Sequence, residues 1–452
     1  MTPSTSGRSP TAALATAVSR LRFEDLPASV VTLAKQCLLD VLGTMAAGSR
    51  EPVADTLAEF VASETPHGPC TLVGRSATAP ATAAALVNGT AGHALDFDDV
   101  ISTVGHPSVA IAPAALAVAE RMSASGPALL TAFVAGVETQ ARVAEAVGPE
   151  HYARGFHSTA TFGSFGAAAA VSSLHGLDAT ATNAALAIAG TQAAGLKAVF
   201  GTMSKPLHAG RAAANGVLAG ELASRGFTSA EDILGHPQGF AAAESDALHA
   251  AALPGEFGAP WHLHEVRFKV HAACYLTHAA IDALAELRSG HGIAADDVEN
   301  VDIAVPPGHL AVCGISDPRS GLEAKFSLRA TAALALQYGH AGPGHFTDTV
   351  TNDPALCTLR RRVSVTPDPS LTGPVARVRL RLRDGRTLSA QQDMRGPAWR
   401  SDPAEQNSRL TGKFAALTAP VLGSERAADV TKAVSTLDEL KDVRDLCRLT
   451  RP

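Results

Sequence analysis

The chain lacks several features, and each absence excludes a class of protein. Its 37 basic side chains are outnumbered by 43 acidic ones, and only 4% of its 452 residues are aromatic. A chain without a basic excess is poorly suited to nucleic acid or an acidic membrane surface. Its longest apolar stretches, around 111–118 and 184–196, are interrupted by proline, glycine or glutamine before they reach the roughly 20 residues of a membrane span. We therefore expect no nucleic-acid partner and no membrane partner.

Cysteine patterns and cofactor motifs are absent as well. The six cysteines form no CxxC pair and no metal-ligand spacing, and the first ten residues lack the apolar core of a signal peptide. We therefore predict free thiols and a cytoplasmic location. The chain has no GxGxxG after a strand, no P-loop, no HExxH and no GxSxG. These absences predict a site that uses no metal and no cofactor.

The part of the chain before about residue 260 is rich in alanine, which favours closely packed helices. Glycine, proline and serine divide this part into helix-length segments. We predict helices at about 11–21, 28–47, 52–64, 78–93, 108–123, 127–147, 159–174, 179–194 and 206–225.

The pattern changes near Pro260. Residues 298–305 and 375–383 alternate between apolar and polar side chains, as strands do, and Asp384-Gly385 predicts a hairpin turn into 386–391. The arginines at 377, 379, 381 and 383 fit the solvated face of one strand. Segments 272–287 and 322–338 between the strands have helical character, as do 402–416 and 425–440 beyond them. The prediction is a mainly α protein: a large all-α domain (1–265), an inserted α+β domain (266–395) and C-terminal helices (396–452) that return to the first domain.

The stretch 201–216, GTMSKPLHAGRAAANG, carries the most chemical information. Pro206 fits the first turn of a helix, which places Lys205 at its start and His208 and Arg211 further along the same stripe. Unpaired N–H groups and the dipole make a helix start attractive to anions, so this segment suits a carboxylate. The alternative is an ordinary helix start with a solvated lysine.

Further candidate residues stand just before predicted helices. Asp96 belongs to the run HALDFDD, which is followed by GHPS with His106, and His157 stands in GFHST. Lys269 and His271 lie where the two domains join. Ser327 follows Lys325 in the inserted domain. Each has a structural alternative, such as a capping aspartate or serine or a loop histidine with a local partner. Together, histidine, lysine and helix starts would bind a small polycarboxylate and move protons at carbon.

These segments together resemble the MmgE/PrpD family, which includes 2-methylcitrate dehydratase, cis-aconitate decarboxylase and iminodisuccinate epimerase. The resemblance rests on HALDFDD, GHPS, GFHSTATFGSFGAAAA, KPLHAGRAAANG and FKVHAACYLTHAAIDAL, which occur in family order over about 10–425. It implies a helical domain with a smaller α+β lid, a homodimer and a cofactor-free site between the domains. Its implied catalytic residues are Asp96, His106, His157, Lys205 and His271.

The sequence departs from the decarboxylase pattern at several positions. Val266 stands where that pattern has its basic residue, and Val100 and Ser102 replace polar residues of the decarboxylase loop. Arg211 within KPLHAGRAAANG is similar to the epimerase branch. The resemblance thus implies proton transfer next to a carboxylate of a di- or tricarboxylic acid, with a lean toward the epimerase. His208, Arg211, Lys269 and Ser327 are the expected substrate-binding residues.

Other functions remain open from the sequence. Dehydration and decarboxylation would use the same set of site residues with a different proton donor. A terpene-cyclase-like protein would use Asp96, Asp98 and Asp99 to bind magnesium, although the chain has few aromatic residues to line a carbocation pocket. A non-catalytic carboxylate-binding or scaffold protein is the third possibility, disfavoured because the five motif positions all keep ionisable side chains.

Overall fold

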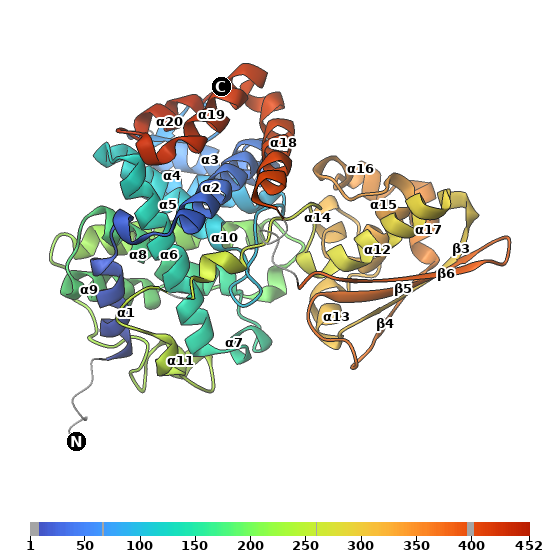
Figure 1. Ribbon diagram of the computed structural model, residues 1–452, viewed down its shortest axis with the longest axis horizontal. Coiled ribbons are helices and arrows are strands. Elements are labelled where there is room, and N and C mark those ends of the chain that lie inside the picture. Colours follow the sequence, from blue (N-terminus) through green and yellow to red (C-terminus); the bar gives the residue numbers. More distant parts are fainter. Residues whose placement is uncertain (1–8, 66, 259, 396–401) are drawn as a thin grey trace.

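The fold is mainly α, as predicted. The structure is a computed structural model that describes residues 9–65, 67–258, 260–395 and 402–452. Figure 1 shows a large helical body, and beside it a smaller unit that contains a sheet. The polar tail at residues 1–8 and the start of the predicted C-terminal segment at 396–401 lie outside the described residues.

The helical body is built from both ends of the chain. Its N-terminal helices are α1 (Pro10–Arg20), α2 (Ala28–Gly48), α3 (Pro52–Glu64), α4 (Ala81–Ala94), α5 (Pro107–Met122), α6 (Gly126–Val147), α7 (Glu150–Ala153), α8 (Ser158–Leu174), α9 (Ala179–Gly190), α10 (Ser204–Ala223) and α11 (Phe240–Glu244). Its C-terminal helices are α18 (Pro403–Leu422), α19 (Ser424–Ser435) and α20 (Arg444–Leu449).

Small residues let the central helices approach each other closely. A Cβ added to Gly210 on α10 would lie 2.2 Å from the carbonyl oxygen of Leu86 on α4, and one added to Gly216 would lie 2.2 Å from Ala167 on α8. Such spacing is open only to glycine. The alanine and glycine content that predicted a compact helical assembly therefore sets the distance between α4, α8 and α10.

Helix α2 lies inside this body and receives the C-terminal helix α18. Gln406 of α18 donates to Gln36 of α2 at 3.0 Å, and Phe414 packs where Gly43 leaves room. Within the described part of the chain, α2 alone is long and apolar enough to cross a membrane, but 78% of its most apolar stretch is buried inside the protein.

The smaller unit is a four-stranded sheet with helices on one face. Strands β3 (Val298–Val305), β4 (Val363–Pro367), β5 (Val375–Leu382) and β6 (Thr387–Asp393) lie in the order β4-β3-β5-β6; β3 and β4 are parallel, and the other pairs are antiparallel. The side chains of Val378 and Leu380 are buried, whereas Arg377, Arg379 and Arg381 are exposed, as the alternation predicts. The helices of the unit are α12 (Tyr275–His291), α13 (Pro307–Cys313), α14 (Gly321–Ala324), α15 (Leu328–Tyr338), α16 (Asp348–Thr351) and α17 (Pro354–Arg361). A lid role for this unit and the boundaries at 265/266 and 395/396 stay predictions.

Several details differ from the expectations, and the short helices α7, α11, α13, α16, α17 and α20 were not anticipated. The helical body contains a short antiparallel pair, β1 (Cys70–Thr71) with β2 (Thr78–Ala79), and β4 was not anticipated. The single helix expected over 322–338 is split into α14 and α15, because the chain turns at Lys325 and Ser327 caps α15.

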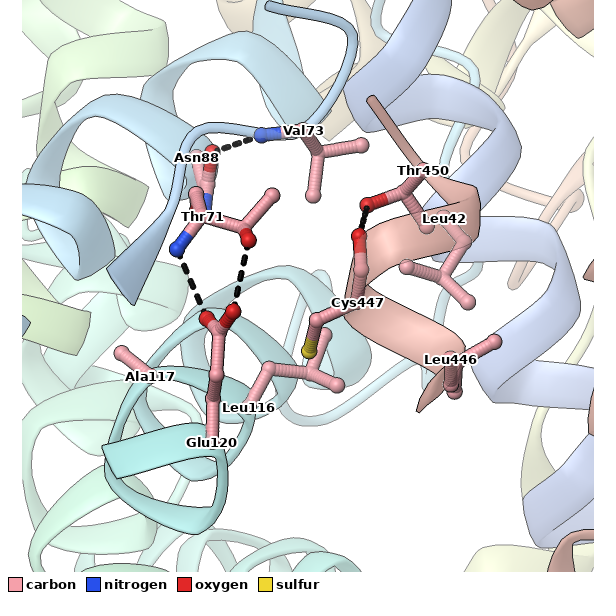
Figure 2. Close-up of a pocket in the computed structure, with 10 residues that line it drawn as sticks. All are labelled: Leu42, Thr71, Val73, Asn88, Leu116, Ala117, Glu120, Leu446, Cys447 and Thr450. Atoms are coloured by element: carbon pink, nitrogen blue, oxygen red, sulfur yellow. Dashed lines mark hydrogen bonds between the residues drawn. The ribbon is translucent and has the colours of Figure 1, made fainter. Parts of the chain in front are cut away.

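A small hollow lies between α20 and the helical body (Figure 2). Glu120, near the end of α5, accepts hydrogen bonds from the Thr71 backbone N–H at 2.7 Å and from its hydroxyl at 2.6 Å. Cys447 of α20 lines the same hollow. The hollow lies at the C-terminal end of α5, so it is remote from His106, which precedes the first turn of that helix.

Candidate active site

Three helices of the body begin at one place, and each contributes an ionisable residue there. His106 is the N-cap residue of α5, His157 is the N-cap residue of α8, and Lys205 lies in the first turn of α10. The His106 N–H donates to the Thr159 hydroxyl of α8 at 3.1 Å, which ties the first two helix starts together. Helix starts carry partial positive charge, so their convergence favours an anionic ligand.

Asp96 lies between two lysines at this place. One carboxylate oxygen is 3.0 Å from the Lys205 ammonium, and the other accepts a short hydrogen bond from Lys269. Burial alone would raise the pKa of Asp96, but the two lysines hold it well below its usual range. Asp96 has a φ of 50°, a left-handed conformation that is uncommon for a residue with a side chain, so the surrounding contacts must maintain it.

Three lysines fix the backbone that carries Asp96. The carbonyl of Leu95 accepts from Lys325 at 2.7 Å, that of Asp96 accepts from Lys269 at 3.0 Å, and that of Phe97 accepts from Lys413 at 2.6 Å. We call Lys269, Lys325 and Lys413 the lysine staple.

The same ammonium groups also bind a second segment of backbone. Lys325 donates to the carbonyl of Ala272, Lys269 to that of Ala273, and Lys413 to that of Lys269. The staple therefore joins segment 95–97 to segment 269–273, and it uses one lysine from the inserted unit, one from the junction and one from α18.

Lys205 and Lys269 differ in how many of their hydrogen-bond donors are already used. A lysine ammonium has three donors. Lys269 uses all three, on the carboxylate of Asp96, the carbonyl of Asp96 and the carbonyl of Ala273. Lys205 contacts Asp96 and lies over the rings of Phe200 and Phe326, 5.5 and 5.0 Å from their centroids, with no second acceptor among the described residues. Lys205 is thus the ammonium with hydrogens left for a ligand.

Asp98 orients two imidazoles behind Asp96. Nδ1 of His93 hydrogen-bonds to Asp98 at 3.0 Å, and Nδ1 of His106 lies 3.0 Å from the other carboxylate oxygen. Burial lowers the pKa of His93 to about 3 and also lowers the pKa of His106, although Asp98 opposes both effects. Both rings are therefore neutral near pH 7, and the His93 ring directs its Nδ1–H at Asp98.

Asp99 belongs to a separate buried group. It accepts from the Ser108 hydroxyl at 2.5 Å and from the Ser108 N–H at 3.2 Å. Burial raises its pKa to about 7, and the nearby Asp40 adds to the rise. Asp40 itself lies 2.7 Å from Lys413, and burial raises its pKa too.

His157 and His208 form a pair at the other side of the cluster. Their Nδ1 atoms lie 3.0 Å apart, and the His157 ring also stacks on His93 at 6.0 Å between centroids. Burial, with Lys205 nearby, lowers the pKa of His157 well below its usual value; burial lowers that of His208 as well.

The cluster fits a metal ion poorly. One ligand atom each from His93, Asp96, Asp98 and His106 lies within 4.8 Å of the others, which is close enough for a metal site. Asp96, however, is already paired with two ammonium groups, so a divalent cation would have to displace Lys205 and Lys269 against charge repulsion. The residues suit an anion better.

The structure brings Asp96, His106, His157, Lys205, His208 and Lys269 together, and it gives the other predicted residues different surroundings. His271 lies within the staple segment 269–273, but its ring is held by Asp282 at 2.8 Å and by the Ala341 N–H at 3.4 Å. Arg211 is exposed and contacts Asn215. Ser327 caps α15 through the Ala330 N–H. Their roles in catalysis or binding stay predictions.

The departures from the decarboxylase pattern also have structural explanations. Val266 is buried in the core of the helical body, and a cation reaches the site from Lys269 instead. Val100 pairs with Arg267 as an isolated bridge, and the Ser102 hydroxyl accepts from Arg267 at 2.8 Å.

Sequence reasoning missed the roles of His93, Asp98, Lys325 and Lys413. His93 and Asp98 stand in the same HALDFDD run as Asp96, so their spacing in that run was a usable signal. Lys413 has no comparable signal, since its acceptors are 316 and 144 positions away in the chain.

Comparisons with known proteins identify a family that covers most of the chain. Residues 12–250 match the MmgE/PrpD N-terminal domain, and residues 271–439 match the MmgE/PrpD C-terminal domain. The chain is similar to a cis-aconitate decarboxylase from Homo sapiens, with 30% identity over 98% of this chain and 95% of that protein. It is similar to a cis-aconitate decarboxylase-like protein, oryM, from Aspergillus oryzae (28% identity; 99% and 98%), and to a cis-aconitate decarboxylase from Aspergillus terreus (25%; 95% and 94%). These relatives carry decarboxylase names, so the lean toward an epimerase is not supported.

Proposed function

This chain belongs to the MmgE/PrpD family, as the resemblance predicted, and its relatives are enzymes of the lyase type; we propose that it removes carbon dioxide from a small unsaturated polycarboxylic acid of the cis-aconitate class. The observation that carries the proposal is the Lys205 ammonium, which Asp96 holds at three converging helix starts with donors to spare. Similarity to decarboxylases along nearly the whole chain supports the choice of reaction.

The reaction needs a place for negative charge and a proton for carbon. The bond between a carboxylate carbon and its neighbour breaks, carbon dioxide leaves, and the electron pair stays on the neighbouring carbon, where the double bond and an adjacent carboxylate spread it. A proton must then be delivered to carbon. Positive charge that is already in place at the developing carbanion lowers the barrier, because the protein groups around it do not have to move during the reaction.

We assign the proton to Lys205. The neighbouring imidazoles are neutral because they are buried, whereas Lys205 is the cationic group with uncommitted N–H bonds. His157 and the helix starts bind carboxylates of the substrate. His106, oriented by Asp98, lies beside Asp96 and keeps that side of the site in place. The scheme uses side chains for both charge and proton, and we retain the homodimer and the cytoplasmic location as part of the proposal.

The test is proton NMR of the purified protein in D2O with cis-aconitate, 2-methylcitrate, citrate and an oxaloacetate–aspartate mixture. The proposal predicts that cis-aconitate is converted to a dicarboxylic acid with one carbon fewer and that carbon-bound deuterium is found in the product. Water addition or elimination without loss of carbon dioxide would instead identify a dehydratase. Exchange of a carbon-bound proton with no new compound would identify an epimerase.

The Lys205→Arg and Lys205→Met variants separate binding from proton transfer. Arginine keeps the positive charge, but its guanidinium does not release a proton under working conditions. We expect Lys205→Arg to bind the substrate without turnover and Lys205→Met to lose both. A Lys205→Arg protein with wild-type turnover would contradict the assigned proton donor.

A further inference from the structure

His208 contacts the site through a histidine rather than through Asp96. Its Nδ1 lies 3.0 Å from Nδ1 of His157, and it stands one turn after Lys205 on α10. His157 is almost completely buried, whereas His208 is half-buried. The charged and titratable groups nearest His157 are Lys205, His93 and His106, besides His208.

Gly195 lies close to both histidines. Its carbonyl accepts from the backbone N–H of His157 at 2.9 Å, and a Cβ added to it would lie 3.2 Å from Nδ1 of His208 and 2.7 Å from Ala160. Its φ of +153° adds strain for any other residue. The contact between the two imidazoles is therefore fixed by the backbone on one side and by α10 on the other.

An Nδ1 to Nδ1 contact restricts the tautomers of both rings. A neutral imidazole has one N–H and one lone pair. Two Nε2–H tautomers would bring two lone pairs together, and two Nδ1–H tautomers would bring two hydrogens together. A 3.0 Å hydrogen bond therefore requires one Nδ1–H ring and one Nε2–H ring.

We infer that His208 is a positioning residue: it donates its Nδ1–H to His157, and this holds His157 in the Nε2–H tautomer that presents a donor to a substrate carboxylate. The direction of the bond rests on the proposed function, because a carboxylate needs a donor from His157. With the bond reversed, Nε2 of His157 would carry a lone pair and would repel the carboxylate. The arrangement follows the general rule that the partner of one ring nitrogen determines what the other nitrogen can do.

The tautomers are measured directly by imidazole 1H–15N NMR on full-length protein labelled with 15N-histidine. The signals of the pair are identified as those lost in His157→Gln and in His208→Asn. The inference predicts an Nε2–H pattern for His157 and an Nδ1–H pattern for His208 at neutral pH. The reverse assignment, or two Nε2–H patterns, would overturn it. This readout needs no turnover, so it stands apart from any failure to find a decarboxylase.

Activity of two variants gives the second test. Phenylalanine at 208 keeps the ring but removes the donor, so we expect His208→Phe to lower kcat by about 10- to 100-fold, the loss found when a metal-bound histidine loses its outer partner. His208→Asn places an amide donor near the position of Nδ1 and should recover part of that loss. His291→Phe, an exposed change at the end of α12, is the matched control and should leave kcat unchanged. Equal activity of His208→Phe and wild type would also overturn the inference.

Discussion

The lysine staple makes a quantitative prediction about Lys413, which α18 contributes from the C-terminal part of the chain. Its ammonium is 2.7 Å from Asp40 and donates to the carbonyls of Phe97 and Lys269 at 2.6 and 3.1 Å. Only 12% of its side chain is exposed. The Lys413→Met variant keeps most of the apolar stem and removes all three contacts.

The expected cost follows from what Lys413 leaves behind. Removing one partner of a buried ion pair costs about 3–5 kcal/mol, because the other charge stays buried. Two features place the loss of unfolding free energy in Lys413→Met at the lower end of this range, about 3 kcal/mol. A pocket of about 280 Å³ beside Lys413 can admit water to the two carbonyls, and burial already raises the pKa of Asp40, so that carboxyl can take up a proton.

The assay is guanidinium unfolding followed by circular dichroism on wild type, Lys413→Met, Asp40→Asn and the double variant. We expect a coupling energy of about 1–3 kcal/mol between the two positions, as for residues in one buried network. Lys432→Met, an exposed lysine on α19, is the control and should shift stability by less than about 0.5 kcal/mol. An unchanged unfolding midpoint for Lys413→Met would refute the staple as a source of stability.

Three further predictions address the proton donor, a buried acid and helix packing. Lys205→Met should lose at least about 100-fold in kcat/KM while its circular dichroism spectrum stays that of wild type, since Lys205 contributes transition-state charge rather than packing; a fully active variant would contradict the site. Asp99 has a pKa of about 7 when folded, so it holds a proton that the unfolded chain releases near pH 4, and stability should fall between pH 4 and 7. Glu138 and Glu244 also have pKa values raised to about 7 and contribute to the same slope, so Asp99→Asn should lessen it by about 1.4 kcal/mol per unit of the Asp99 pKa shift, and a slope equal to that of wild type would rule Asp99 out. Gly210→Val should destabilise the protein by at least about 3 kcal/mol, because even a Cβ lies 2.2 Å from a backbone carbonyl oxygen; thermal unfolding measures it, and a neutral effect would mean that α4 and α10 can separate.

Local sequence patterns predicted most of the helices and strands. The strand at 298–305 was expected at its observed limits, because it alternates strictly and ends at two prolines. The hairpin at Asp384-Gly385 follows from turn chemistry, and the exposed arginines of β5 follow from its period of two. Strand β4 has weak alternation of its own, and it exists because it pairs in parallel with β3.

The site was predictable where its residues precede helices and hidden where distant segments meet. His106, His157 and Lys205 stand at helix starts that proline or a following alanine-rich run makes visible. A helix start capped by Ser327 was an alternative open from the sequence, and the structure confirms it, whereas the acceptors of Lys325, the carbonyls of Leu95 and Ala272, were not visible because they are distant in the chain. Arg211 shares the helical stripe of Lys205 and His208, yet its side chain is exposed and contacts Asn215. The helical spacing alone therefore did not show which residues of the stripe reach the site.

The most direct test of the central claim is carbon dioxide release from cis-aconitate by wild type and by Lys205→Arg, with substrate binding measured in parallel by calorimetry. If Lys205 delivers the proton, wild type releases carbon dioxide and forms the shortened dicarboxylic acid in equal amount, while Lys205→Arg binds cis-aconitate and releases none. Wild-type protein that binds cis-aconitate and leaves it unchanged, or Lys205→Arg protein that releases carbon dioxide at the wild-type rate, would contradict this claim.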